Sequence, residues 1–162
     1  MLQAARMVAA CVPPFEAPGD WLSVVLPRSA DACYALFCDI ERTPEWVPVL
    51  ATAAVTDRGR GGRARKVAFQ ARLERATIGY SCVYRYDRGG RQIAWATPPR
   101  SGLGVRGMAR FQPIADAACL ATYALDVRVD EHLPRFADPA YALHASSATL
   151  AGFRAFAERV LA

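Results

Sequence analysis

Two tyrosines in the middle of the chain are the residues best suited to chemistry. Residues 77–87 alternate between two faces, and the alternation places Tyr80 and Tyr84 on the same face with Cys82 between them. A tyrosine hydroxyl can donate a proton to an enolate or hold a carbonyl oxygen, so Tyr80 and Tyr84 are the candidate catalytic residues if the protein is an enzyme. A buried tyrosine is more often a core residue whose hydroxyl has found a partner. Both interpretations stay open.

The sequence offers little for metal or cofactor chemistry. Its five cysteines include no CxxC pair and no zinc spacing, and we expect them to be small buried residues in a reducing cytoplasm. His132 and His144 have no Cys, Asp or Glu at metal-ligand spacing. Residues 59–62, Gly-Arg-Gly-Gly, join two expected strands and predict a hairpin turn, which is no phosphate-binding loop. We therefore expect no metal and no cofactor.

Length, composition and charge indicate one globular domain. The chain has 162 residues, of which 53% are hydrophobic and 22% charged. No apolar run approaches the ~20 residues of a membrane helix, so we expect no integral membrane association. The net charge of +5 comes from scattered arginines without a basic stripe, which predicts a solvated rim and no nucleic-acid partner. The sequence leaves a monomer and a homodimer both open.

The periodicity predicts an α+β fold in which one strand and two helices precede a run of strands and a long helix. Residues 1–19 end in two proline-containing turns and read as an N-terminal extension to a domain over 20–162. Two-residue alternation from about residue 50 indicates an antiparallel sheet with one apolar face. The last helix must cover that face. The expected elements are a strand at 21–26, a helix from the N-cap Ser29 to about 40, a very short helix from Pro44, strands at 64–74, 77–87, around 93–97, 105–112 and 118–129, and a helix at 139–161.

This order of elements, together with residues 39–46, Asp-Ile-Glu-Arg-Thr-Pro-Glu-Trp, resembles the START-like (helix-grip, SRPBCC) superfamily. The resemblance is to its polyketide cyclase/dehydrase and lipid-transport branch, whose members carry an acidic residue, a short gap and Pro-x-Trp here. It covers residues 20–162 and implies a curved antiparallel sheet wrapped around the long C-terminal helix. It also implies a cavity for a lipid, isoprenoid or polyketide-like molecule. The alternative that it implies is an aromatase/cyclase or dehydratase working in the same pocket.

The arginines separate this chain from the cyclases that it resembles. Aromatase/cyclases of this superfamily generally keep an arginine in the pocket, on the strand that corresponds to 77–87. Here Tyr84 stands at the matching position and Arg85 points to the other face. Arg65 falls on the apolar face of its strand, near the strand end, where we expect it to reach the cavity mouth.

Small residues opposite aromatic ones predict that the cavity stays open. Gly107 and Ala109 lie on the inward face of their strand, and residues 145–152 make the middle of the last helix slim through three alanines and a glycine. The alternative is that Trp95 and its aromatic neighbours fill the space and give a dry, packed core. The residues expected to contact the ligand are Phe37, Trp46, Leu50, Val67, Phe69, Tyr80, Cys82, Tyr84, Trp95, Gly107, Ala109, Phe111, Tyr123, Ser146, Leu150 and Phe153.

Overall fold

The computed structural model describes residues 19–73, 76–129 and 139–161. The predicted extension therefore lies outside the described residues except for Gly19, and so does His132. The elements are β1 (Leu22–Leu26), α1 (Ala30–Phe37), η1 (Ile40–Glu45), β2 (Leu50–Arg58), η2 (Arg60–Gly62), β3 (Ala64–Arg72), β4 (Thr77–Tyr86), β5 (Gln92–Ala96), β6 (Leu103–Ala115), β7 (Ala118–Val129) and α2 (Pro139–Val160).

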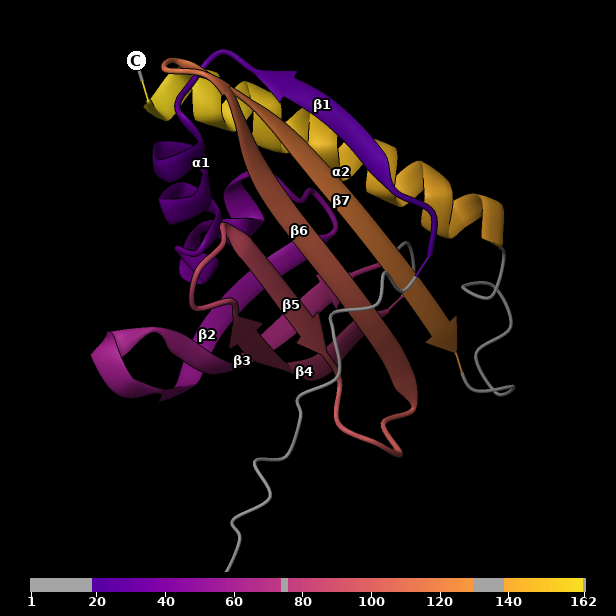
Figure 1. Cartoon of the computed structure of the whole chain (residues 1–162). Helices are drawn as coiled ribbons and strands as arrows, with labels where there is room; N and C mark the ends of the chain where they lie inside the picture. Colours follow the sequence, from indigo (N-terminus) through magenta and orange to yellow (C-terminus); the bar gives the residue numbers. More distant parts are fainter. Residues whose placement is uncertain (1–18, 74–75, 130–138, 162) are drawn as a thin grey trace, which may run out of the picture.

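The strands form one curved antiparallel sheet in the order β1-β7-β6-β5-β4-β3-β2. Figure 1 shows α2 lying along β1 and β7, with α1 near one end of it. This arrangement confirms the predicted α+β helix-grip fold. The sheet must be covered on one face because its strands alternate between buried and exposed residues.

The connection between the first helix and the sheet differs from the prediction. Ser29 is the N-cap of α1, as expected, and its hydroxyl accepts a hydrogen bond from the Ala32 backbone N–H at 3.2 Å. However, α1 ends at Phe37, and a 3-10 helix, η1, replaces the short helix that we expected to begin at Pro44. Pro44 lies inside η1 instead of starting it, because the turn already begins at Ile40.

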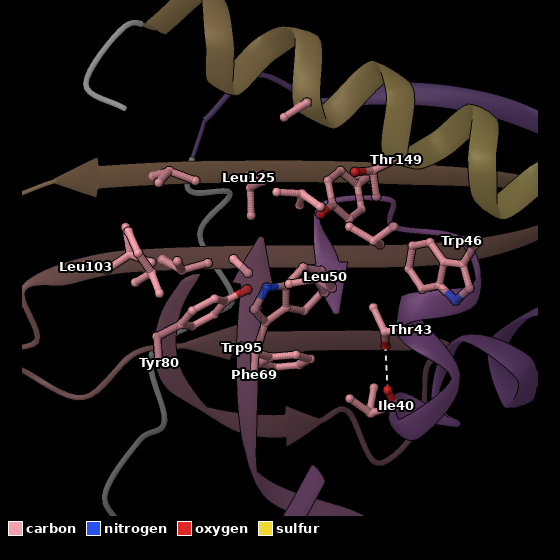
Figure 2. Close-up of a pocket in the computed structure, with 18 of the residues that line it drawn as sticks. Ile40, Thr43, Trp46, Leu50, Phe69, Tyr80, Trp95, Leu103, Leu125 and Thr149 are labelled. Atoms are coloured by element: carbon pink, nitrogen blue, oxygen red, sulfur yellow. Dashed lines mark hydrogen bonds between the residues drawn. The ribbon is translucent and has the colours of Figure 1, made fainter. Parts of the chain in front are cut away.

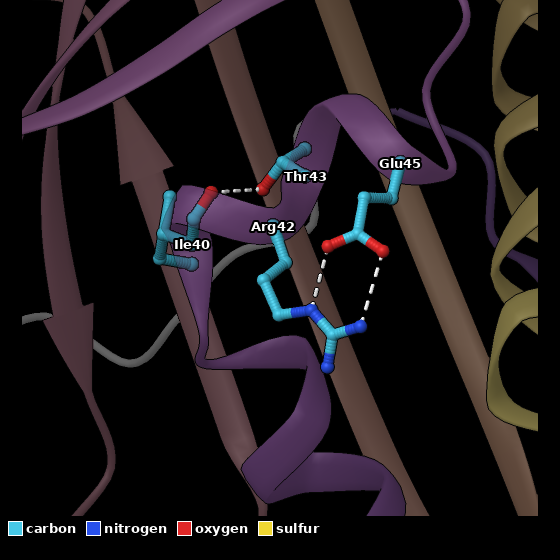
Figure 3. A network of polar contacts seen from close by, with 4 residues as sticks. All are labelled: Ile40, Arg42, Thr43 and Glu45. Carbon is cyan, nitrogen blue, oxygen red and sulfur yellow. Dashed lines mark hydrogen bonds and ion pairs between the residues drawn. The ribbon is translucent and has the colours of Figure 1, made fainter. Parts of the chain in front are cut away.

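Two polar contacts hold η1 in shape (Figure 3). The Thr43 hydroxyl donates to the Ile40 carbonyl oxygen at 2.6 Å, and this pair is buried. Arg42 and Glu45 form a two-point ion pair on the exposed side, with N–O distances of 2.6 and 3.0 Å. These contacts stabilise a compact turn between α1 and β2, and the turn places Trp46 in the core.

Arg65 was predicted to lie on the apolar face of its strand and to reach the cavity mouth, but it is not among the cavity-lining residues. Residues three apart on an unbroken strand lie on opposite faces, yet Ala64 and Val67 are both buried. The pairing of β2 with β3 is irregular beside Asp57, and this shift sends Arg65 outward, where it forms an ion pair with Asp57. The alternation could not reveal the irregularity, because a one-residue shift leaves the composition of the strand unchanged.

The core is centred on four aromatic side chains from four different elements. Phe37 of α1, Trp46 after η1, Phe111 of β6 and Phe153 of α2 have ring centroids 5.0 to 5.8 Å apart in the contacting pairs. Each ring is 1 to 6% exposed. This cluster fixes η1 and α2 against the sheet.

One face of α2 supplies the remaining packing. Thr149, Phe153 and Phe156 are buried. Ala148 and Ala151, which we expected to help make the helix slim toward the cavity, are exposed. Their small size therefore has no bearing on the cavity.

The last turn of α2 is held by the connection between β1 and α1. Arg28 donates hydrogen bonds to the carbonyl oxygens of Glu158, at 3.0 Å, and of Leu161. The last carbonyl groups of a helix have no partner within the helix, and a cation at a helix C-terminus is electrostatically favourable.

Candidate ligand-binding cavity

A cavity of about 160 Å³ lies between the sheet, η1 and α2 and is partly open to solvent. Figure 2 shows Thr149 projecting from α2 on one side and Tyr80, Phe69 and Trp95 projecting from the strands on the other, with Trp46 at the η1 end. Its lining among the described residues contains no Asp, Glu, Lys, Arg or His side chain. The polar side chains of its lining residues are those of tyrosine, threonine and tryptophan.

Half of the sixteen residues expected to contact a ligand lie on the cavity wall. These eight are Phe37, Trp46, Leu50, Phe69, Tyr80, Tyr84, Trp95 and Tyr123. The other eight are buried but do not line the cavity: Val67, Cys82, Gly107, Ala109, Phe111, Ser146, Leu150 and Phe153. Ligand contact stays a prediction for the first group, and the structure gives no support for it in the second.

Gly107 and Ala109 do not create the open space. A Cβ atom added to Gly107 would overlap Cε2, Cζ2 and Nε1 of Trp95, the last at 2.5 Å. The indole thus lies directly over Gly107, and Ala109 is packed at 1% exposed. The alternative that Trp95 fills this region is therefore correct locally, but the cavity remains open elsewhere along the sheet.

Gly152 serves packing as well. A Cβ atom at this position would overlap the carbonyl oxygen of Trp46. The glycine therefore lets α2 approach the end of η1 closely.

Thirteen residues of the cavity lining were missed by the sequence interpretation, and they fall into two groups. Ile40, Thr43, Val47 and Val49 come from η1 and the loop after it, where no two-residue alternation exists. The remainder are Ala71, Leu73, Ile78, Leu103, Val105, Leu125, Val127, Ala145 and Thr149. Several of these share the inward faces of β3, β4 and β7, so the alternation itself contained the signal.

The tyrosines at the edges of the core have hydrogen-bond partners inside the protein. The Tyr34 hydroxyl donates to the Gln92 carbonyl oxygen at 3.4 Å, and the Tyr86 hydroxyl donates to the Ala64 carbonyl oxygen at 2.7 Å. Both are therefore core tyrosines whose hydroxyl groups are hydrogen-bonded within the protein.

The tyrosines on the cavity wall differ in this respect. Tyr123 of β7 and Thr149 of α2 both line the cavity, and the Thr149 side chain opposes the rise that burial causes in the pKa of Tyr123. Tyr80 and Tyr84 make ring contacts, Tyr80 stacking on Phe69 at 5.3 Å and Tyr84 on Trp95 at 6.0 Å. Their hydroxyls make no hydrogen bond within the described part of the chain.

Burial governs the protonation of these groups. Desolvation raises the pKa of Tyr80, Tyr84 and Tyr123 well above the ordinary value, and it raises the pKa of the nearby Cys82 to about 12. All four side chains are therefore neutral near pH 7. The tyrosines can donate hydrogen bonds, but they do not act as bases.

Nothing in the described ranges suggests a metal centre or a membrane span. No three His, Cys, Asp or Glu side chains among the described residues come together as metal ligands. None of the described helices is long and apolar enough to cross a membrane. Cys33, Cys38, Cys82 and Cys119 are free thiols.

A family model described as polyketide cyclase/dehydrase and lipid transport matches residues 22–160. No curated protein matches the sequence closely enough to count as a relative.

Several solved structures share the fold at low sequence identity. A START superfamily protein from Mycobacterium smegmatis has a TM-score of 0.73 at 17% identity, covering 87% of this chain and 97% of its own. The Zhui aromatase/cyclase from Streptomyces sp. R1128 has a TM-score of 0.71 at 15% identity, covering 88% and 94%. The di-domain aromatase/cyclase StfQ of the steffimycin biosynthetic pathway has a TM-score of 0.68 at 16% identity, covering 87% and 45%. At these identities the similarity extends to the fold alone.

Proposed function

The chain belongs to the polyketide cyclase/dehydrase and lipid-transport family of START-like proteins, and we propose that it binds an uncharged hydrophobic small molecule in the cavity beneath α2. The observation that carries the proposal is the cavity itself, which is apolar and has no charged side chain in its described lining. Burial of apolar surface is favourable at ~25 cal/mol per Å². A charged ligand would lose its hydration without gaining an ion pair, so the lining selects neutral molecules.

We favour a carrier or sequestering protein over an enzyme. The neutral tyrosines can hold a ligand oxygen, whereas removing a proton from a substrate needs a base that the described lining does not supply. The described lining also lacks the arginine expected of an aromatase/cyclase, since Tyr84 lines the wall and Arg85 is exposed. A lipid, an isoprenoid or a polyketide-like molecule each fits this chemistry.

Cyclisation or dehydration of a polyketide-like chain is the second candidate. It is favoured by the similarity to structures described as aromatase/cyclases and by two tyrosine donors on the cavity wall. Product formation from a poly-β-keto substrate mimic would distinguish the two functions. We expect binding without turnover; turnover that falls by ~10² or more in Tyr84→Phe would establish the enzyme instead.

A titration with an uncharged fluorescent probe, N-phenyl-1-naphthylamine, tests the binding function. Ala145 lines the cavity from α2, and the exposed Ala148 on the same helix provides the matched control. We expect saturable binding in the wild type and in Ala148→Phe, and weaker binding in Ala145→Phe because its ring occupies ligand space. Equal affinity in the two variants, or no saturable binding in the wild type, would contradict the proposal.

A further inference from the structure

Strand pairing gathers four cations on the face of the sheet that points away from the cavity. Lys66 of β3 and Arg106 of β6 lie in one cross-strand row, with one residue of β4 and one of β5 between them. Arg85 of β4 lies beside this row, and Arg110 follows four residues after Arg106 on β6. At ~4.8 Å between strands and ~3.3 Å per residue, the Cα atoms cover about 14 by 13 Å. We call these four residues the cationic face.

The cationic face has no counter-ion in the described part of the chain. All four side chains are exposed, and none forms an ion pair with a described carboxylate. Asp126 lies opposite Arg106 on β7, but it forms its ion pair with Arg128 at 3.0 Å. Five other described arginines are paired with carboxylates: Arg42, Arg58, Arg65, Arg91 and Arg154. The positive charge of the cationic face therefore stays available to an anionic partner.

Arg110 is fixed at the edge of this face by its neighbours. Its Nε donates to Oε1 of Gln92 at 3.1 Å, and its guanidinium lies 5.8 Å from the centroid of the Trp21 ring. Gln92 is fixed in turn, because its amide nitrogen donates to the Met108 sulfur at 3.4 Å. Trp21 is 38% exposed, so an indole and a guanidinium lie together beside solvent. Indole rings are enriched at membrane–water interfaces.

The surface between the cations favours a diffuse negative partner. Ala94 and Ala96 of β5 form its floor. Small side chains offer no pocket for the aromatic or arginine anchors that carry most of the energy of a protein interface. The cations form a patch about as wide as it is long, which differs from the stripe that a nucleic-acid backbone follows. A bilayer surface with anionic lipids requires only exposed cations.

We propose that the cationic face binds the surface of a membrane that contains anionic lipid headgroups. The attraction is electrostatic and peripheral, and no segment of the chain has to enter the bilayer. Arg85 and the cavity-lining Tyr84 are neighbours on β4 and point to opposite faces. The inference therefore concerns a different surface from the cavity and does not depend on the proposed binding function.

Sedimentation of the full chain with large unilamellar vesicles tests the proposal. We expect binding to vesicles of POPC with about 25% POPG, no binding to POPC alone, and release when NaCl is raised from about 50 to about 500 mM. In the Arg85→Gln/Arg106→Gln double variant the partition coefficient should fall roughly 30-fold, equivalent to ~1 kcal/mol for each cation. The control is Arg60→Gln/Arg88→Gln, which removes the same charge from two exposed turns and should keep nearly the wild-type partition coefficient.

Several results would overturn the membrane assignment. These are equal binding to neutral and anionic vesicles, no binding to either, or the same loss in both double variants. Retention of the wild type by duplex DNA or poly-glutamate, without sedimentation on vesicles, would assign the face to another partner and overturn it as well. The binding of N-phenyl-1-naphthylamine is measured without lipid, so the cavity proposal stands or fails separately.

Discussion

Replacing Gly107 with alanine should displace Trp95 into the cavity. The added Cβ would stand 2.5 Å from Nε1 of the indole and closer still to two ring carbons. Unstrained contacts between non-bonded heavy atoms lie near ~3.5 to 4.0 Å, so the ring has to move by about 1 Å or more. The backbone of β6 cannot yield instead, because it is paired with β5 on one side and β7 on the other.

The direction in which the Trp95 ring moves determines how much stability and ligand affinity the variant loses. Trp95 also contacts Phe37, Tyr84 and Tyr123, with centroid separations of 5.7 to 6.0 Å, and the remaining free direction is the cavity. Overpacking a core costs ~1 to 3 kcal/mol, and room in the cavity places this variant toward the lower end. Loss of ligand contact equivalent to one methylene group is worth ~0.8 kcal/mol, roughly a fourfold rise in Kd.

Thermal denaturation and a titration with N-phenyl-1-naphthylamine measure the two effects. A loss of ~1 kcal/mol corresponds to a fall of about 2 to 4 °C in Tm for a domain of this size. Gly104→Ala is the control on the same strand, since its Cβ would meet its nearest atoms at 3.5 Å; it should leave both Tm and Kd unchanged. If Gly107→Ala behaves like Gly104→Ala in both assays, the indole does not occupy the space over Gly107 and the placement of the cavity is refuted.

Three further changes probe the frame around the cavity. Gly152→Ala should lower the free energy of unfolding by ~1 to 3 kcal/mol in chemical denaturation, because the Cβ overlaps the Trp46 carbonyl oxygen; a gain of ~1 kcal/mol from helix propensity alone would contradict this. Arg28→Met should cost ~1 to 2 kcal/mol by removing the hydrogen bonds to the last turn of α2, and an unchanged Tm would show that these bonds contribute nothing. The Tm should also fall as the pH rises above about 10. Burial raises the pKa of Tyr84 above its ordinary value of 10.0. The stabilisation that the neutral Tyr84 side chain gives the folded state is therefore complete below that pH and is lost as the hydroxyl ionises. Tyr84→Phe should flatten this decline, and an unchanged slope would contradict the direction of the shift.

Strand periodicity was sufficient to predict a one-sided antiparallel sheet with a covering helix, and the resemblance carried by residues 39–46 added the helix-grip arrangement. The inward residues of β4 and β7 follow from alternation alone, and so does the need for a covering helix. Arg65 shows the limit of the method, because the irregular pairing near Asp57 reverses the faces without any change in composition.

The cavity could be predicted only in part, since space depends on where large side chains point. A glycine on an inward face is equally compatible with an open space or with the ring of a neighbouring side chain above it. At Gly107 the ring of Trp95 occupies that space. Gly152 is ambiguous in the same way, because it permits close backbone approach instead of widening the cavity. The η1 residues such as Thr43 were missed because a 3-10 turn has no extended period to recognise.

The open cavity has an energetic cost that ligand binding can recover. At ~24 cal/mol per Å³, leaving about 160 Å³ empty corresponds to roughly 4 kcal/mol, an upper bound because solvent reaches part of the space. That is a large share of the ~5 to 15 kcal/mol by which a domain is stable, so collapse would be favoured if the walls could move. Three contacts hold the walls apart. Gly152 packs closely against the Trp46 carbonyl, and Trp95 packs over Gly107. Arg28 donates a hydrogen bond to the Glu158 carbonyl at the end of α2. Walls held apart in this way cannot close over the space, so the cost falls when an apolar molecule fills the cavity.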